Sequence, residues 1–323
     1  MVSPASEIAR AVATLRAGGL VAFPTETVYG LGADAENPDA LARLFAVKGR
    51  PTDHPVIVHV GASSALDEWA IDVPDTAREL AAQFWPGPLT LVTRAGPRVS
   101  RLATGGLDTV GLRVPDHPLA LDLLRAFGGG VAAPSANRFG QVSPTTADAV
   151  RRELGDDVDR ILDGGPCVVG VESTIVECTG DEVAVLRPGR ITSEMIEAVL
   201  GRAPNIGGTT RAPGSLPAHY APDARVELVA AAEVESAVVR LRDGGHRVGV
   251  LGLAADVVGL DSAVTLATVV TVDEYARVLY AALRAADEMG IDVVVAVPPA
   301  AVGIGIAVRD RLRRAATAGS VQR

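Results

Sequence analysis

Apolar side chains occur along this chain in two patterns, short continuous runs and longer stretches with an apolar residue at every third or fourth position. In the first stretch, Ile8, Val12 and Leu15 fall on one face of a helix. Pro4 is suited to the start of that helix and Gly18 to its end. Because such stretches predict helices and short apolar runs predict buried strands, the pattern indicates a protein of interspersed helices and strands.

The alternation continues through the first part of the chain. Strands are expected at residues 20–23, 56–60, 89–93, 109–114, 131–133, 160–162, 173–177 and 183–186. Helices are expected after Asn37-Pro38, at 74–83, after His117-Pro118 and after Thr192. The spacing between these elements is irregular. We therefore expect a mixed α/β sheet and not a doubly wound parallel one.

A change of composition divides the chain. Residues 201–224 are rich in glycine, proline and small residues and lack periodicity, which is typical of a linker. Beyond them we expect strands at 226–229, 248–251 and 292–297 and helices at 233–242, 273–289 and 308–316. The predicted organisation is a large domain (1–203), a linker (204–224) and a small βαβα-type domain (225–323).

Composition narrows the functional classes. The net charge of −9 argues against a protein that holds nucleic acid by its overall field, and the 3% aromatic content argues against a base-stacking platform. An anionic ligand would need a local basic site. The sequence has no apolar run long enough to span a membrane and no secretory signal, so we expect a cytoplasmic protein. Both cysteines are interpreted as small apolar residues.

The basic residues are unusual in kind. Lys48 is the only lysine, and every other residue among the 30 lysines and arginines is an arginine. An ammonium is a compact point charge that a guanidinium does not replace at a phosphate, so Lys48 is a candidate for a specific role. The alternative is a lysine retained by chance on a surface helix.

Polar residues gather where the predicted strands end, which is where α/β proteins place ligands. The four segments are PTETVYGLG at 24–32, KGRPTDHP at 48–55, TVGLRVPDHP at 109–118 and APSANRFG at 133–140. Arg113 lies within an apolar strand and must find an anion, because an unpaired buried charge is costly. The glycines of the first segment would let the backbone approach a ligand.

Each segment also has a plainer interpretation. The first could be a turn, Lys48 and Arg50 a solvated helix end, and Ser135 to Asn137 a helix cap. Arg113 could pair with an internal carboxylate such as Asp116. Taken together, three cations with many hydroxyls and glycines, and without an evident nucleophile, favour a site that holds a polyanion and a small polar acid by positioning. No P-loop, Rossmann fingerprint, HExxH or hydrolase triad occurs, so any ATP site is unconventional.

Several strings together resemble one family. GLVAFPTETVYGLG, KGRPTDHPVIVHV, PGPLTLV, TVGLRVPDHP, APSANRFGQVSPTTA, ESTIVE and LRPG occur in order over residues 15–195. They are similar to the YrdC-type threonylcarbamoyl-AMP synthases, and the remainder resembles the long form of that family. The resemblance implies a YrdC-like twisted mixed sheet with a concave ligand cavity, followed by a small Rossmann-like domain.

The resemblance also implies a reaction. L-threonine, bicarbonate and ATP would give threonylcarbamoyl-adenylate and pyrophosphate, with Mg²⁺ accompanying ATP and no metal ligand assigned to the protein. A downstream transferase would use the product for N6-threonylcarbamoyladenosine in tRNA, with weak or no direct tRNA binding by this chain and no membrane partner. The alternatives are an RNA-binding module and a carbamoyl-adenylate-forming domain of another pathway, such as hydrogenase maturation.

Residue roles follow from the same resemblance. Lys48 and Arg50 match the basic pair at the ATP phosphates and are the expected catalytic residues. The residues expected to bind ATP are Lys48, Arg50, His54, Thr109, Ser135, Asn137, Ser143, Arg187 and Tyr220. Those expected to bind threonine are Thr27, His59, Arg113, Ala133 and Ser173, with Arg113 as the partner of the carboxylate.

Tyr220 belongs to the linker string HYAP and resembles a residue that folds back over the nucleotide, which would make the linker a lid. The family usually carries a methionine and a basic residue before this string. Here Ser215 and Leu216 stand at those places.

Overall fold

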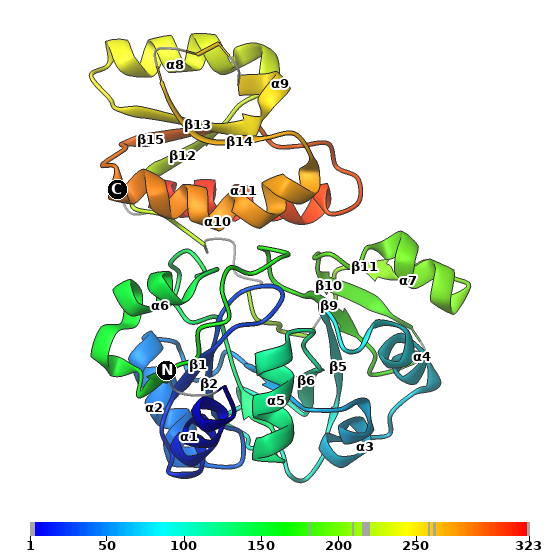
Figure 1. The fold of residues 1–323 in the computed structure, drawn as a ribbon. Coiled ribbons are helices and arrows are strands. Elements are labelled where there is room, and N and C mark those ends of the chain that lie inside the picture. Colours follow the sequence, from blue (N-terminus) through cyan, green and yellow to red (C-terminus); the bar gives the residue numbers. More distant parts are fainter. Residues whose placement is uncertain are drawn as a thin grey trace. The chain divides into compact units, whose positions relative to one another are not determined.

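The structure is a computed structural model that describes residues 4–180, 182–208, 210–214, 220–257, 259–260 and 263–321 (Figure 1). The chain divides into two compact units. The first contains Met1–Phe139, Pro144–Val168 and Glu172–Ser215, and the second contains Gly140–Ser143, Val169–Val171 and Leu216–Arg323. Two short segments that interrupt the first unit in sequence thus group with the C-terminal unit. The domain boundaries predicted from the linker composition remain a prediction.

The elements of the first unit agree closely with the apolar pattern. Its helices are α1 (Pro4–Arg16), α2 (Pro38–Lys48), η1 (Ser63–Ala65), α3 (Leu66–Trp69), α4 (Asp75–Phe84), α5 (Pro118–Phe127), α6 (Ala147–Leu154), η2 (Gly155–Asp157) and α7 (Ser193–Leu200). Its strands are β1 (Val21–Phe23), β2 (Gly30–Asp34), β3 (Ile57–His59), β4 (Ala70–Ile71), β5 (Leu89–Ala95), β6 (Thr109–Arg113), β7 (Val131–Ala132), β8 (Arg160–Ile161), β9 (Thr174–Glu177), β10 (Ala184–Arg187) and β11 (Asn205–Ile206).

These strands form one mixed sheet in the order β11-β10-β9-β5-β6-β3-β7-β2-β1-β8, with β4 beside β5. Four pairs are parallel (β1/β8, β3/β6, β5/β9 and β10/β11) and the other pairs are antiparallel. The prediction of a mixed sheet is confirmed. Strand β11 lies within the predicted linker, which therefore begins as part of this sheet.

Strand β2 occupies the second half of the PTETVYGLG segment. A side chain at Gly32 would come within 2.7 Å of a Val131 methyl carbon and 2.9 Å of the Phe23 ring, and one at Gly30 would contact Phe23 and Ala133. The two glycines therefore make room for side chains of neighbouring strands. Their presence reflects packing within the sheet, which is a different reason from the approach to a ligand that the sequence suggested.

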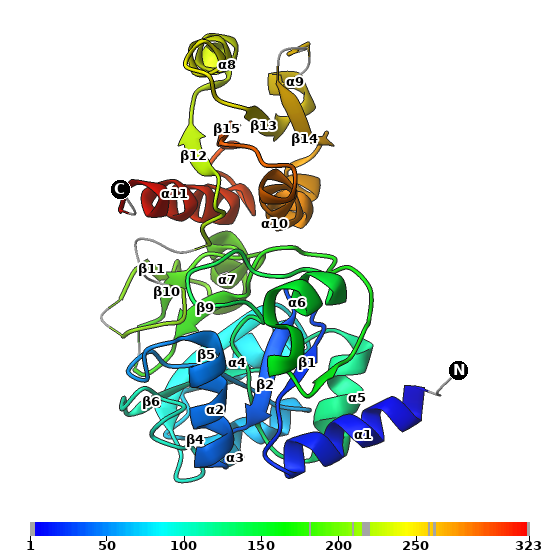
Figure 2. The ribbon, with the colours of Figure 1, turned by 90° about the vertical axis from the view of Figure 1, so that its left-hand side faces the viewer.

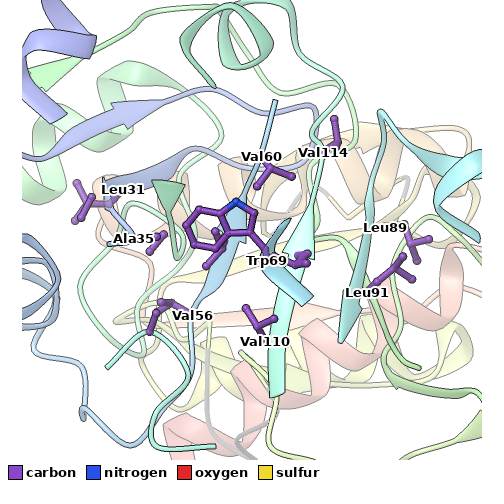
Figure 3. Packing of buried hydrophobic residues seen from close by; sticks show 14 of the residues in the cluster. Leu31, Ala35, Val56, Val60, Trp69, Leu89, Leu91, Val110 and Val114 are labelled. Atoms are coloured by element: carbon purple, nitrogen blue, oxygen red, sulfur yellow. The ribbon is translucent and has the colours of Figure 1, made fainter. Parts of the chain in front are cut away.

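The two faces of the sheet bury separate apolar clusters. The larger cluster surrounds Trp69 and includes Leu31, Val56, Val110 and Leu91, which Figure 3 shows around the indole. It also takes in apolar residues of α2, α4, α6 and α7. On the other face, α1 and α5 pack together over β1 and β7. Both helices lie over the end of the sheet that contains β1, β2 and β7.

The second unit is a parallel sheet between two layers of helices. Its elements are β12 (Arg225–Leu228), η3 (Ala231–Glu233), α8 (Val234–Asp243), β13 (Val248–Leu253), α9 (Ala254–Val257), β14 (Val264–Val269), α10 (Val272–Glu288), β15 (Val293–Ala296) and α11 (Gly305–Val321). The strand order is β12-β15-β13-β14, and all three pairs are parallel. Helices α8 and α9 lie on one face and α10 and α11 on the other (Figures 1 and 2). This is the small Rossmann-like arrangement that the sequence resemblance implied.

No helix within the described residues combines the length and the apolar character needed to cross a membrane.

Candidate active site

One face of the large sheet gathers residues from five strands. His59 is the register partner of Arg113, and Ile57 is the partner of Gly111 two positions earlier. Register partners point to the same face, and so do residues two apart on a strand. By the same rule, Thr90 and Val92 of β5, Ile175 of β9, and Arg187 of β10 share this face with Arg113. The sheet therefore presents cations, hydroxyls and apolar side chains together.

The floor of this region is apolar. Ile57, Val92 and Ile175 form a small buried cluster, and Ala212, from the segment after β11, packs on it. Gly111 lies between Thr109 and Arg113 and has no side chain to cover this part of the sheet. An apolar floor with a few polar groups at its edge is the usual composition of a small-molecule site.

Arg113 forms a buried ion pair. Its Nη2 donates to Glu26 Oε1 at 2.6 Å and to Thr27 Oγ1 at 3.0 Å, and its Nε donates to Gly87 O at 3.3 Å. The Arg113 and Glu26 side chains are both about 5% exposed or less. Nη1 makes no hydrogen bond with any described residue. The guanidinium is thus fixed on one side and retains a free donor nitrogen on the other.

The partner of Arg113 is a residue to which we assigned no role from the sequence alone. Glu26 was noted only as part of the polar loop, and Asp116 was the internal carboxylate considered. Asp116 instead donates its backbone N–H to Glu26 Oε2 at 2.9 Å. The need of a buried arginine for a carboxylate could have pointed to Glu26, because it is the acidic residue adjacent to Thr27.

The threonines of the loop form an ordered chain of hydrogen bonds. Thr25 Oγ1 donates to Val28 O at 2.6 Å, so the 2.8 Å contact between Thr25 and Thr27 has Thr27 as its donor. Thr27 Oγ1 then accepts from Arg113. Successive hydrogen bonds of this kind polarise one another and hold Thr27, which is fully buried, in one orientation.

His59 is buried beside Arg113. Burial, with the nearby Arg113 charge, lowers the pKa of His59 to about 3. The imidazole is therefore neutral near pH 7. Its Nδ1 is buried and has no hydrogen-bond partner among the described residues, and its ring meets that of Phe23 edge-on at 5.8 Å between centroids.

Lys48 is the last residue of α2, a helix that is capped at both ends. Asn37 caps the start of the helix by accepting from Asp39 N and Ala40 N, and Gly49 ends it with a left-handed φ of 63°. Lys48 Nζ donates to Ser135 O at 2.6 Å and to Asn137 O. The ammonium has three hydrogens, so one donor remains.

Lys48 is only 2% exposed, which excludes the interpretation as a solvated helix end. Burial lowers the pKa of Lys48 well below its ordinary value, and the charge of Arg50 lowers it further. A buried amine next to a guanidinium is stabilised in its charged form by an incoming anion. This favours phosphate binding at Lys48.

Arg50 is held against the loop that follows it. Its Nη2 donates to Pro55 O at 2.8 Å and its Nε to His54 O at 3.3 Å. Its guanidinium carbon lies 5.6 Å from the centroid of the Phe139 ring, which the His54 ring meets edge-on. Burial and the charge of Arg50 lower the pKa of His54.

Arg187 and Ser173 form another polar group on the face of the sheet that carries Arg113. Arg187 Nη2 donates to Ser173 Oγ at 3.1 Å and to Ser173 O at 3.0 Å, and Nη1 donates to Pro213 O at 2.9 Å. Ser173 Oγ also lies 2.8 Å from Thr90 Oγ1. Thr90 is a second residue that the sequence analysis missed, because it falls inside a strand with apolar neighbours.

Of the remaining expected residues, Ala133 donates its N–H to Ile57 O, and Ser135 forms an isolated bridge with Gly30. The bridge connects two parts of the site. One is the segment 135–137, whose carbonyl groups accept hydrogen bonds from Lys48, and the other is β2, which follows the Thr25–Thr27 loop. Ser143 and Tyr220 group with the second unit. There the Tyr220 ring lies 5.6 Å from the Tyr280 ring and beneath the Arg311 guanidinium at 5.3 Å. Ser215, Leu216 and His219 lie outside the described residues.

Neither cysteine is suited to nucleophilic chemistry. Burial raises the pKa of both Cys167 and Cys178 to about 12, so neither forms a thiolate near pH 7.

Comparisons with known proteins show which family this chain resembles. A family model described as "Telomere recombination" (Sua5_yciO_yrdC) matches residues 13–189, and one described as "Threonylcarbamoyl-AMP synthase, C-terminal domain" matches residues 191–317. The threonylcarbamoyl-AMP synthase of Bacillus subtilis is 42% identical, over 96% of this chain and 93% of its own length. The Pyrococcus abyssi enzyme of the same name is also 42% identical, over 93% of this chain and 91% of its own.

A solved structure supports the same assignment. The match to the crystal structure of P. abyssi Sua5 complexed with L-threonine covers 99% of this chain and 96% of the Sua5 chain, with 40% sequence identity and a TM-score of 0.91. The similarity therefore includes both units. The chain belongs to the threonylcarbamoyl-AMP synthase family.

Proposed function

We propose that this chain makes threonylcarbamoyl-adenylate from L-threonine, bicarbonate and ATP, with release of pyrophosphate, as the donor for N6-threonylcarbamoyladenosine in tRNA. Family membership supports the reaction. The observation that carries it is the pair of buried cations, Lys48 and Arg113, each of which is fixed by the protein and retains a free donor. Such cations suit a substrate pair that brings both a polyphosphate and a carboxylate.

The threonine subsite is proposed at Arg113. Its free Nη1 would bind the carboxylate, while Glu26 and Thr27 hold the guanidinium in place. His59 is neutral and would not repel the ammonium of the amino acid. Ser173 offers a hydroxyl on the same face, and Ala133, whose N–H is used by Ile57, would offer its carbonyl oxygen.

The ATP subsite is proposed at the end of α2. Lys48 and Arg50 would neutralise the phosphates, and the segment with Ser135 and Asn137 would lie along the nucleotide. His54, Thr109 and Arg187 complete the proposed set within the first unit.

The reaction needs the protein to position its substrates, and it needs no nucleophile from the protein. Bicarbonate takes up a proton and loses water to give CO₂. The neutral threonine amine bonds to the carbon of CO₂ and releases a proton, and an oxygen of the resulting carbamate then attacks the α-phosphorus. The new O–P bond forms as the bond from the α-phosphorus to the bridging oxygen breaks, and pyrophosphate leaves. Lys48 and Arg50 would stabilise the charge that develops on the phosphate oxygens and the leaving group. The two unreactive thiols are consistent with this mechanism.

We propose that Mg²⁺ enters bound to the phosphates of ATP. No group of three or more candidate ligands (His, Cys, Asp or Glu) occurs among the described residues, and the buried carboxylate of the site, Glu26, is engaged by Arg113. Mg²⁺ commonly binds through substrate phosphates and water with few protein ligands. We assign it no step. We further propose that the reaction is cytoplasmic and that a separate transferase carries the product to tRNA.

The test is product formation with labelled bicarbonate. We expect mass spectrometry to find threonylcarbamoyl-adenylate with the ¹³C label when threonine, ATP and bicarbonate are all present. Replacing L-threonine by L-valine, which lacks the hydroxyl, is the matched control. ATP consumption that is indifferent to the amino acid, or an adenylate without the label, would overturn the proposal.

A further inference from the structure

The C-terminal unit contains a cavity that the proposed reaction does not use. Its volume is ≈ 360 Å³, and it lies at the carboxyl ends of the parallel strands β12 and β15. The residues lining it are Leu228, Val229, Ala230, Pro298, Arg309 and Arg313. Leu228 is the last residue of β12, and Val229 and Ala230 follow it. Pro298 follows β15, and the two arginines come from α11, which packs against β12 (Figure 2).

The two arginines are available for a ligand. Arg309 and Arg313 are one turn apart on α11 and therefore lie on the same side of the helix. Neither forms an ion pair with a described residue. Arg309 donates only to Pro299 O, at 2.8 Å, and the Arg313 side chain makes no hydrogen bond in the described part of the chain. The nearby carboxylate of Asp310 is engaged by Arg311 and Arg314.

These two arginines differ from many surface arginines of the chain, which pair with acidic residues. Arg98, for example, binds both Glu36 and Glu68, and Arg240 binds Glu227. Two adjacent unpaired guanidiniums repel each other, which an anion between them would relieve.

The position in the sheet also favours a ligand. In open parallel sheets, ligands bind beyond the carboxyl ends of the strands, chiefly where the connections of adjacent strands diverge. Here that crevice lies between β13 and β15, and it is filled. Tyr275 Oη lies 3.2 Å from both Leu251 O and Val297 O, and Val257 and Val297 pack against Gly252. The open space is beside the neighbouring pair, β12 and β15.

The first turn after β12 adds a further feature. The chain passes from Ala230 directly into η3, the three-residue turn that precedes α8. Glu233 Oε2 accepts from Ala230 N at 3.3 Å and brings one negative charge to the rim. The two arginines outnumber it.

We propose that this cavity binds the phosphate group of a small phosphorylated molecule. Two guanidinium groups match the charge and the three oxygens of a phosphate monoester, whereas a carboxylate is satisfied by one. Leu228, Val229 and Pro298 form an apolar wall for the uncharged part of such a molecule. The cavity is thus a second ligand site, and it belongs to the C-terminal unit alone.

The test is isothermal titration of the full-length chain with AMP and with inorganic phosphate at low salt. We expect Arg313→Glu to weaken one binding event by at least about tenfold, because a charge-assisted contact is replaced by a repulsion. Arg242→Glu is the matched control, since Arg242 is an exposed arginine near the end of α8 without a partner in the described residues. It should bind as the wild type does.

AMP resembles part of ATP and could also bind at the proposed ATP subsite. A further variant, Lys48→Met, distinguishes binding at that subsite from binding in this cavity. The event that Arg313→Glu weakens should persist in Lys48→Met. Tighter binding of AMP than of phosphate would indicate that the apolar wall contributes. Absence of binding by the wild type at millimolar concentrations, or equal binding by Arg313→Glu and Arg242→Glu, would overturn the proposal.

Discussion

Glu26→Gln tests whether the buried ion pair holds Arg113 in place. The substitution keeps the shape of the side chain and removes its charge. In the structure Glu26 accepts from Arg113 Nη2 at 2.6 Å and from Asp116 N at 2.9 Å. A glutamine has a single acceptor oxygen, so it can keep one of these bonds, and its amide nitrogen must then face the other donor.

The expected cost is about 3 kcal/mol of unfolding free energy. Removing one partner of a buried ion pair costs about 3–5 kcal/mol, and the retained hydrogen bond places this variant at the lower end. With a urea slope of about 2 kcal/mol per M, the unfolding midpoint should fall by about 1.5 M.

Tryptophan fluorescence is suited to this measurement because the two tryptophans, Trp69 and Trp85, both belong to the first unit. Glu68→Gln is the matched control. Glu68 pairs with Arg98 at the surface, where ion pairs contribute about 0–1 kcal/mol. If Glu26→Gln unfolds at the same urea concentration as Glu68→Gln, the pair does not anchor Arg113 and the reasoning fails.

Two other predictions concern His59 and Tyr220. The folded pKa of His59, about 3, lies below the unfolded value of about 6.5, so the unfolded chain binds more protons between these values. The His59 contribution to stability is therefore complete above pH 6.5 and is lost as the pH falls towards 3. Urea titrations should show a shallower loss in His59→Asn than in the wild type, by up to about 1.4 kcal/mol per pH unit; parallel curves would contradict the assignment. Tyr220→Ala should raise the KM for ATP if the linker is a lid, whereas Tyr220→Phe, which keeps the ring over which Arg311 lies, should not. Unchanged kinetics in Tyr220→Ala would leave the linker as a tether.

Local sequence signals specified much of the fold. Asn37-Pro38 and Thr192 begin helices where expected, and Asn37 and Thr192 both cap them through their side chains. Strands with continuous apolar runs, such as 89–93 and 109–114, were located to within two residues. These features depend on neighbours in the sequence, which is why the sequence alone predicts them.

Features that depend on distant partners were not predictable in the same way. Strand β2 was missed because its sequence, Gly30–Asp34, has little apolar periodicity and is stabilised by pairing with β1 and β7. Strand β14 was missed for a similar reason, since it is an exposed edge strand. Lys48 and Arg113 were identified as candidates, but Glu26 and Thr90 became visible only through the contacts that they make across the sheet.

In the proposed reaction, Arg113 binds the carboxylate of threonine and Lys48 binds the phosphates of ATP. The most direct measurement is the pair of KM values, for threonine and for ATP, in Arg113→Gln and Lys48→Met. Loss of a charge-assisted contact of about 1.5–3 kcal/mol predicts a KM for threonine at least about tenfold higher in Arg113→Gln, with the KM for ATP nearly unchanged, and the reverse in Lys48→Met. Equal changes of both KM values in each variant would contradict the division of the site into these two subsites.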